Sequence, residues 1–449
     1  MERPAPGARS VFFVLRRFLL FLLIALAGVG LVWAGLLWVS APEPTNNVMT
    51  GTGVELRVGE QAAGGVSAID YRRLDERLQR LMADPAMVGL AVAVVEDGRV
   101  SFIKGYGRTI AGGEEAVTTR TVFRWASLSK GVAADMVALL AHEGQLSLDE
   151  PVVRYASSLR LPNGNEHRAT VADILSHRTG LFGHAQDARL EDGQDPRWLR
   201  MGLATLHNIC APGTCHAYQN VAYDAASEMV ERATGRPFGD EVVERLFRPL
   251  GMRSASFGRA ALMASPSWAR AHIGGDTPRP FETTEPYYRV PAAGGVNGTI
   301  EDLATWMVAQ MGAMPAVLPA DVLRAVQTPR VRTPGETRRR RVYAERTPVS
   351  AYGLGWRVFN YAGHRVIGHH GGVRGYRSLI LFDPERRSGV VALWNASTGK
   401  PNGIEYEVMD MIYGLPFRDW LRLDTPEGEA PVGDEAIGNE AEAEVSGGD

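Results

Sequence analysis

Ser127 and Lys130 are the two residues whose types and spacing point most directly to chemistry. They precede a run, 132–140, that lacks glycine and proline, so we expect a helix that opens at Ser127 and carries Lys130 on the same face. A desolvated lysine can take the proton of a serine hydroxyl, and helix N-terminal amides can stabilise an oxyanion. Ser129 is the rival nucleophile, but successive helix residues are about 100° apart, so it should point away from Lys130. The spacing therefore predicts Ser127 as the nucleophile.

Two further polar residues could complete such a site. Tyr218 and Asn220 follow a cysteine pair, and a phenol can shuttle a proton while a carboxamide can hold a substrate amide. Both patterns are short: a serine at a helix start is usually a cap, and a buried tyrosine usually belongs to the core. The function therefore depends on whether the fold brings these residues together.

A glycine-rich strand supplies the third element. In the run 366–376, His369 and Gly371 should share one face of the strand while His370 points to the other. Glycines there let a substrate backbone approach closely. A histidine that only makes structural hydrogen bonds is the alternative interpretation.

Strand patterns lie at both ends of the folded region, with helical patterns between them. Asp97-Gly98 between two β-rich runs predicts a hairpin. Four later runs, bounded by turn residues, are expected strands: 356–360, 364–368, 376–382 and 390–395. The region 131–311 is expected to be mainly helical. We therefore expect an α/β (α+β) fold with one antiparallel sheet flanked by helices and an inserted helical lobe, in which the first hairpin pairs with the last strands.

Composition divides the chain into five segments. They are a cytoplasmic N-terminus at 1–17, a transmembrane signal anchor at 18–40, a linker at 41–67, a catalytic domain at 68–421 that opens with an amphipathic helix, and an acidic disordered tail at 422–449. The uncharged apolar run 18–39 exceeds the roughly 20 residues that cross a bilayer, and four arginines precede it. We expect a single-pass protein of a bacterial inner membrane with its catalytic domain in the periplasm. A signal peptide cleaved after Ala41 is the alternative.

Other features narrow the classes of partner. Export makes a disulfide between Cys210 and Cys215 plausible, and free thiols are the alternative; two cysteines alone do not make a zinc site. The basic run 338–341 is expected in a solvated loop, and with no aromatic interleaving it gives no case for nucleic acid. We expect no metal and no cofactor.

Taken together, the motifs resemble the serine β-lactamase-like superfamily, which includes class C β-lactamases, low-molecular-weight penicillin-binding proteins and related esterases. The resemblance spans about residues 71–414. Supporting segments occur in the family's order at 175–181, 249–252, 293–296 and 352–356. It implies a two-lobed β-lactamase-like (DD-peptidase) fold.

The resemblance also implies roles for individual residues. Ser127 matches the acyl-enzyme nucleophile, Lys130 its proton acceptor, and Tyr218 the general acid/base, with Asn220 as amide-binding partner. His369 matches the first residue of a His-x-Gly motif that includes Gly371, and the oxyanion hole would be the amides of Ser127 and Gly372. His177 lies in a segment that looks structural.

One departure concerns substrate choice. The best-studied β-lactamases carry a lysine where this chain has His369, and an unperturbed histidine, with a pKa near ~6.5, is mostly neutral at pH 7. This weakens the case for β-lactam hydrolysis and suits esterases or peptidases. Arg374, nearby on the same edge, is a candidate to bind a substrate carboxylate, with a surface arginine as the alternative. Expected substrates are β-lactams, peptidoglycan-derived D-amino-acid peptides or small esters. A membrane-tethered binding or scaffolding protein without turnover is the other class.

Overall fold

The computed structural model describes residues 67–424. The predicted N-terminus, anchor and linker lie outside the described residues, as does the tail from residue 425. Within 67–424, no helix is both long enough and apolar enough to span a membrane. Asp424, predicted to lie in the tail, is among the described residues and forms ion pairs with Arg77 and Arg80.

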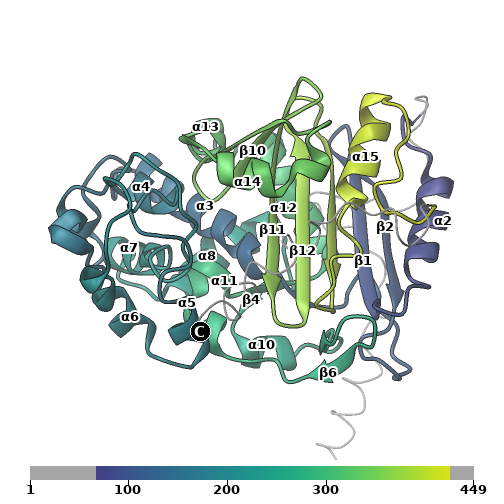
Figure 1. Ribbon diagram of the computed structural model, residues 1–449, viewed down its shortest axis with the longest axis horizontal. Coiled ribbons are helices and arrows are strands. Elements are labelled where there is room, and N and C mark those ends of the chain that lie inside the picture. The colour runs from purple at the N-terminus through teal and green to yellow at the C-terminus, as the bar shows by residue number, and fades with distance from the viewer. Residues whose placement is uncertain (1–66, 425–449) are drawn as a thin grey trace, which may run out of the picture. The chain divides into compact units, whose positions relative to one another are not determined.

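The predicted antiparallel sheet is present and has eight strands (Figure 1). Every neighbouring pair is antiparallel, and the first hairpin joins the last strand, as predicted. In spatial order the strands are β2 (Arg99–Gly107), β1 (Gly89–Glu96), β13 (Ser388–Trp394), β12 (Tyr376–Asp383), β11 (His364–Val373), β10 (Arg357–Tyr361), β9 (Val349–Tyr352) and β8 (Val331–Arg332).

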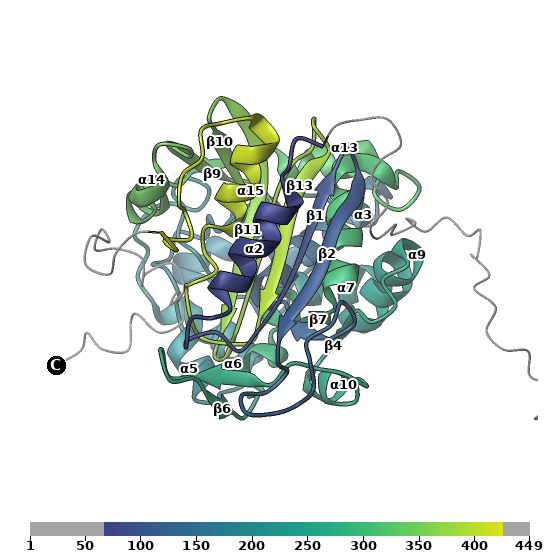
Figure 2. The same cartoon turned by 90° about the vertical axis from the view of Figure 1, so that its right-hand side faces the viewer.

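The apolar residues of β1 explain why the sheet is covered on both sides. Ala91, Ala93 and Val95 belong to one hydrophobic core, and Leu90, Val92 and Val94 to a second. Because successive side chains point to opposite faces of a strand, a continuous apolar run requires packing on both. Helices α2 (Tyr71–Leu81) and α15 (Ile404–Tyr413) cover the second core, as Figure 2 shows.

Helices of the inserted region cover the other face of the sheet and extend into a separate lobe, as predicted (Figure 1). Two small sheets, absent from the predictions, brace this region: β3 (Phe123–Arg124), β7 (Val296–Gly298) and β4 (Ser256–Phe257), and β5 (Ala271–Ile273) with β6 (Arg279–Phe281). The helices are α3 (Ser129–His142), α4 (Val171–Leu175), α5 (Asp187–Glu191), α6 (Pro196–Gly202), α7 (Ala225–Thr234), α8 (Phe238–Val242), α9 (Arg248–Leu250), α10 (Arg259–Met263), α11 (Pro291–Gly294), α12 (Ile300–Val308), α13 (Ala320–Gln327) and α14 (Pro334–Arg339).

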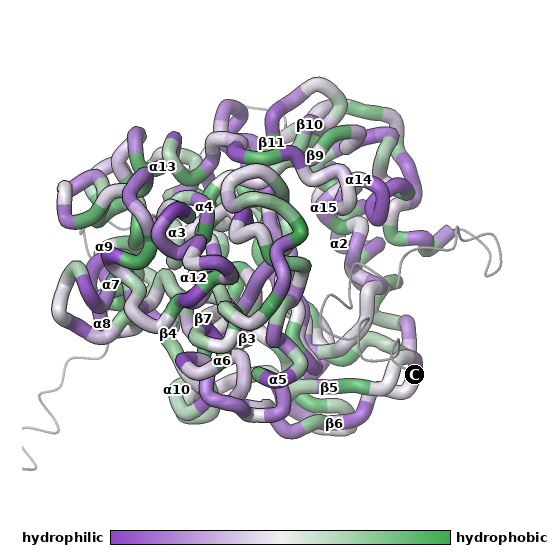
Figure 3. Tube along the Cα trace, turned by 60° about the vertical axis from the view of Figure 1, so that its left-hand side comes forward, coloured by the Kyte–Doolittle hydropathy of each residue, from purple (hydrophilic) through white to green (hydrophobic). Residues whose placement is uncertain are grey.

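The basic run 338–341 corrects one expectation. It is not a solvated loop: it ends the hydrophilic helix α14 (Figure 3) and continues into a 3₁₀ turn. Arg340 is buried, and its guanidinium donates to the Tyr406 hydroxyl at 2.9 Å. The sequence alone did not identify Arg340 as buried, because a run of four arginines does not show which side chain points into the protein.

Asp135 is a carboxyl buried in the middle of α3, and it provides a test of the core. Its Oδ2 accepts from Trp306 Nε1 at 2.9 Å and from Gln310 Nε2 at 2.6 Å, and burial raises its pKa to about 8. Its Oδ1 has no hydrogen-bond partner among residues 67–424. The two donors favour the ionised carboxylate, but neither carries a charge and burial outweighs them, so the folded state favours the protonated acid.

We predict that Asp135 makes the protein less stable as the pH rises. Its pKa is higher in the folded chain than the ~3.9 of an unfolded one, so between these values the unfolded state releases a proton that the folded state keeps. The free energy of unfolding should fall by about 1 kcal/mol per pH unit between about pH 4 and 8. Urea titrations should show this slope in the wild type and a smaller one in Asp135→Asn. Equal slopes would contradict the prediction.

Candidate active site

Ser127 and Lys130 lie side by side, as predicted, although the local structure differs from the expectation. Ser127 does not open the helix: it sits in a 3₁₀ turn, Ala126–Leu128, and α3 begins at Ser129. Ala126 has φ 48°, in the left-handed region that non-glycine residues rarely adopt. Lys130 Nζ lies 3.3 Å from Ser127 Oγ, so a proton can pass between them.

Ser129 has a structural role in this turn. Its hydroxyl donates to the Ala126 carbonyl at 2.6 Å and accepts from the Val296 amide at 3.0 Å. The side chain is buried, and both hydrogen bonds tie the turn to β7. The rival serine thus holds the backbone that presents Ser127.

Lys130 is fully buried and surrounded by acceptors. Its Nζ donates to Asn220 Oδ1 at 2.6 Å and to the Ala293 carbonyl at 3.0 Å. The same nitrogen lies 4.7 Å from the centre of the Tyr218 ring. The structure therefore brings four of the predicted site residues together: Ser127, Lys130, Tyr218 and Asn220.

The segment that carries Tyr218 is fixed by a disulfide and by His177. The predicted Cys210–Cys215 bond is present, three residues before Tyr218. The Ala217 amide donates to the His177 carbonyl at 3.0 Å, and the His177 ring packs 4.3 Å from the Tyr218 ring. Covalent and packing constraints together limit the positions that the phenol can take.

His369 faces the site and His370 faces away, as the strand alternation predicted. His370 Nε2 pairs with Glu405 of α15 at 2.9 Å on the opposite side of the sheet. His369 is buried, and its ring lies 6.1 Å from that of Tyr218. Burial and then the charges of Arg357 and Lys130 lower the pKa of His369 well below its ordinary value. This histidine is therefore neutral near pH 7.

Gly371 is required by the close approach of β11 to the Ser127 turn. A Cβ at this position would lie 2.5 Å from the Trp125 carbonyl and 3.1 Å from the Ser127 amide nitrogen. Ser378 on β12 donates to the same Trp125 carbonyl at 2.7 Å. The next residue, Gly372, continues β11 beyond this contact; its part in an oxyanion hole stays a prediction.

Arg374 lies apart from this buried group. It is exposed on the turn between β11 and β12, and its guanidinium carbon lies 4.6 Å from the centre of the Phe281 ring. Its predicted role in binding a substrate carboxylate stays a prediction.

Arg357, Glu336 and Tyr352 border the site and were missed by the motif analysis. Arg357 Nη1 donates to His369 Nε2 at 3.1 Å, and its Nε and Nη2 pair with Glu336 at 3.1 and 3.2 Å. Burial alone would raise the pKa of the Glu336 carboxyl, but the Arg357 charge lowers it to about 2. An arginine directly after Trp356, within an apolar strand pattern, was the available signal, because such a residue must be paired when it is buried.

Hydrogen-bond partners fix the tautomers of His177 and His369. The Gln219 amide donates to His177 Nδ1 at 3.1 Å, so His177 carries its proton on Nε2, which lies 3.2 Å from the Tyr352 hydroxyl. His369 Nδ1 donates to the His370 carbonyl at 2.6 Å, so His369 Nε2 is the acceptor, and its single lone pair is shared by Arg357 at 3.1 Å and the Tyr352 hydroxyl at 3.0 Å. His177, set aside as structural, thus connects to His369 through one tyrosine.

No group of three or more His, Cys, Asp or Glu side chains within 67–424 is arranged to hold a metal ion.

Comparison with known proteins identifies the family. The model of the beta-lactamase family matches residues 74–409, so this chain belongs to the beta-lactamase family. A penicillin-binding protein homologue from Pyrococcus abyssi superposes with a TM-score of 0.69 at 23% identity, covering 77% of this chain and 78% of the other. The fold is therefore the β-lactamase-like one predicted from the motifs.

Two relatives with assigned names share less of their length. The unguisins hydrolase ungD' of Aspergillus campestris is 28% identical over 324 residues, covering 69% of this chain and 58% of that protein. The D-alanyl-D-alanine-carboxypeptidase/endopeptidase AmpH of Escherichia coli K12 is 25% identical over 241 residues, covering 52% and 60%. The chain thus spans about three fifths of the length of these relatives.

We predict that Glu336→Gln destabilises the protein strongly. It leaves the buried guanidinium of Arg357 without the Glu336 charge, which should lower the free energy of unfolding by about 3–5 kcal/mol. The loss should be constant above about pH 5 and fade as the pH falls from the ~4.3 of an unfolded glutamate toward about 2.

Chemical denaturation followed by circular dichroism measures this loss. The matched control is Glu336→Gln combined with Arg357→Met, which removes both charges and should recover most of the stability. A double variant as unstable as Glu336→Gln alone would show that the ion pair is not the cause.

Proposed function

We propose that this protein is a serine hydrolase that works through an acyl-enzyme on Ser127. The observation that carries the proposal is the 3.3 Å contact between Ser127 Oγ and the buried Lys130 Nζ, with the Tyr218 ring 4.7 Å from the same nitrogen. Ser127 Oγ attacks the substrate carbonyl while Lys130 takes its proton. Tyr218, which packs against Lys130, would then pass that proton to the leaving group, which departs as an alcohol or amine. Water then hydrolyses the acyl-serine to a carboxylic acid and restores the hydroxyl.

The His-x-Gly motif offers no free positive charge to a substrate. It therefore favours esters or amides that carry no carboxylate next to His369. His369 carries no charge near pH 7, and the Arg357 charge beside it is already matched by Glu336. The relatives named above include one that acts on unguisins and one on D-alanyl-D-alanine peptides. We infer small esters and D-amino-acid amides or peptides without a carboxylate next to the scissile bond as the substrate class, with β-lactams and free D-alanyl-D-alanine termini as poorer substrates. A binding protein without turnover is the competing proposal.

Covalent labelling tests the nucleophile. A fluorophosphonate probe should label the wild type but not Ser127→Ala, because the Ser127 hydroxyl lies 3.3 Å from Lys130. Ser129→Ala should still be labelled, although more slowly, because Ser129 only supports the turn that presents Ser127. Loss of Ser127 should reduce ester hydrolysis by several orders of magnitude, since nucleophile and base act as a unit. Peptide mass spectrometry locates the adduct. An adduct on Ser129 would overturn the assignment, and labelling without ester turnover would support the binding protein.

We also propose that the protein is anchored in the inner membrane with its catalytic domain in the periplasm. The apolar run 18–39 behind four arginines supports this, as does a disulfide that suits an oxidising compartment. Alkaline phosphatase fused after Thr50 should be active, because this reporter needs the periplasm, and the intact chain should sediment with membranes. A soluble mature protein starting near Pro42 would contradict the anchor.

A further inference from the structure

The carboxamide of Asn220 lies between two ionisable side chains, Lys130 and Asp187. Its Oδ1 accepts from Lys130 Nζ and its Nδ2 donates to Asp187 Oδ2, each at 2.6 Å. All three residues are buried, with exposed fractions of 0% for Lys130, 6% for Asn220 and 7% for Asp187. Bulk water is therefore a poor substitute for either contact.

Asp187 decides which way this carboxamide points. An ionised carboxylate only accepts hydrogen bonds, so it holds the NH₂ group of Asn220 toward itself and the carbonyl toward Lys130. A neutral amide in place of Asp187 could donate or accept equally well. The Asn220 side chain would then be free to turn over and exchange its oxygen and nitrogen.

This orientation matters because of the lone pair on Lys130. A neutral amine has two N–H donors and one lone pair, and Nζ lies 2.6 Å from Asn220 Oδ1, 3.0 Å from the Ala293 carbonyl and 3.3 Å from Ser127 Oγ. If the carbonyls of Asn220 and Ala293 take the two hydrogens, the lone pair is left for the Ser127 hydroxyl. A reversed Asn220 would donate an N–H toward Nζ and occupy the lone pair that must receive the serine proton.

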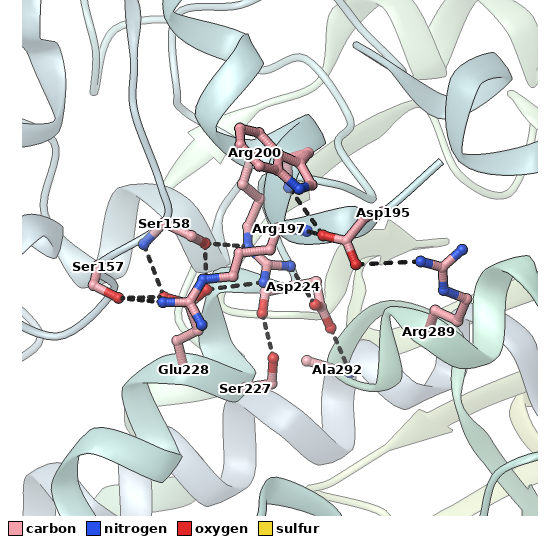
Figure 4. Close-up of polar contacts among 11 residues, drawn as sticks. Ser157, Ser158, Asp195, Arg197, Arg200, Asp224, Ser227, Glu228, Arg289 and Ala292 are labelled. Atoms are coloured by element: carbon pink, nitrogen blue, oxygen red, sulfur yellow. Dashed lines mark hydrogen bonds and ion pairs between the residues drawn. The ribbon is translucent and has the colours of Figure 1, made fainter. Parts of the chain in front are cut away.

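The second acceptor of Lys130 is held separately. Asp224 Oδ1 accepts from the Ala292 amide at 3.0 Å, and its Oδ2 accepts from Arg200 at 2.6 Å, which fixes α11 and the Ala293 carbonyl (Figure 4). A backbone carbonyl in a short helix cannot turn over as a side-chain amide can. Asn220 is therefore the partner of Lys130 whose orientation must be fixed by another side chain.

Asp187 is itself held in place by the loop before it. It is the first residue of α5, preceded by His184 and Gln186 with φ of 56° and 72°. The Asp187 amide donates to the His184 carbonyl at 3.0 Å, and His184 Nδ1 lies 2.9 Å from the oxygen that holds Asn220. His184 and Gln186 are not glycines, so their left-handed conformations are strained. This strain indicates that the rest of the structure holds the backbone in the conformation that places Asp187.

We propose that Asp187 is a positioning residue that keeps the lone pair of Lys130 available to Ser127 by fixing the orientation of the Asn220 carboxamide; this inference rests on the proposed function. Asp187→Asn should slow acylation by a fluorophosphonate, and lower kcat for an ester, by about tenfold or more, because the reacting groups are no longer held in line. KM and the thermal midpoint should change little.

The matched control is Glu191→Gln, which removes the same charge from the same helix and contacts Tyr287 rather than Asn220. Its acylation rate should stay within about twofold of the wild type, the size of a small effect on the barrier. Equal losses in both variants would show a general charge effect and overturn the proposal. An unchanged Asp187→Asn would overturn it as well.

A double-mutant cycle then asks whether Asp187 acts through Asn220. In an Asn220→Ala background, Asp187→Asn should cause no further loss of acylation rate, because there is no carboxamide left for Asp187 to orient. Additive losses would overturn the proposal; if acylation of Asn220→Ala is too slow to follow, the comparison with Glu191→Gln decides. A wild type that is never acylated would instead refute the proposed hydrolase.

Discussion

The buried amine of Lys130 is the constraint around which the site is built. An amine without solvent must find its hydrogen-bond partners in the protein, and here they come from segments far apart in the chain: Ser127, Asn220 and Ala293. Each segment is held by a further residue. Ser129 holds the 3₁₀ turn, Asp187 holds the Asn220 side chain of the disulfide-linked loop, and Asp224 holds α11. The helical lobe thus positions the groups that form hydrogen bonds with Lys130 Nζ.

The sheet supplies the other wall and sets its distance from the nucleophile. β11 approaches the Ser127 turn so closely that Gly371 leaves no room for a side chain, and Ser378 of the neighbouring strand binds the same turn. β12 is itself held by β13, which pairs with β1 and so joins the first and last parts of the domain. The position of Ser127 relative to β11 therefore depends on contacts from several parts of the fold.

Local patterns in the sequence predicted the elements well because hairpins, strand alternation and helix spacing are local physics. The Asp97-Gly98 hairpin, the split between His369 and His370 and the pairing of Ser127 with Lys130 all follow from spacing. The long-range partners of single buried side chains were not visible. Nothing near Arg340 shows that it turns inward, and nothing near Arg357 names Glu336 as its partner, because burial and ion pairing are decided by segments that meet only in the fold.

The Arg357–Glu336 pair has a consequence for how this site can evolve. A lysine in place of His369, the form that the best-studied β-lactamases carry, would put a second cation beside Arg357 in a volume where Glu336 is the matched carboxylate. That substitution alone should be unfavourable, so its effect depends on the residue at 357. An evolutionary path toward the lysine form would have to replace Arg357 first, and the two positions should vary together among descendants of this protein.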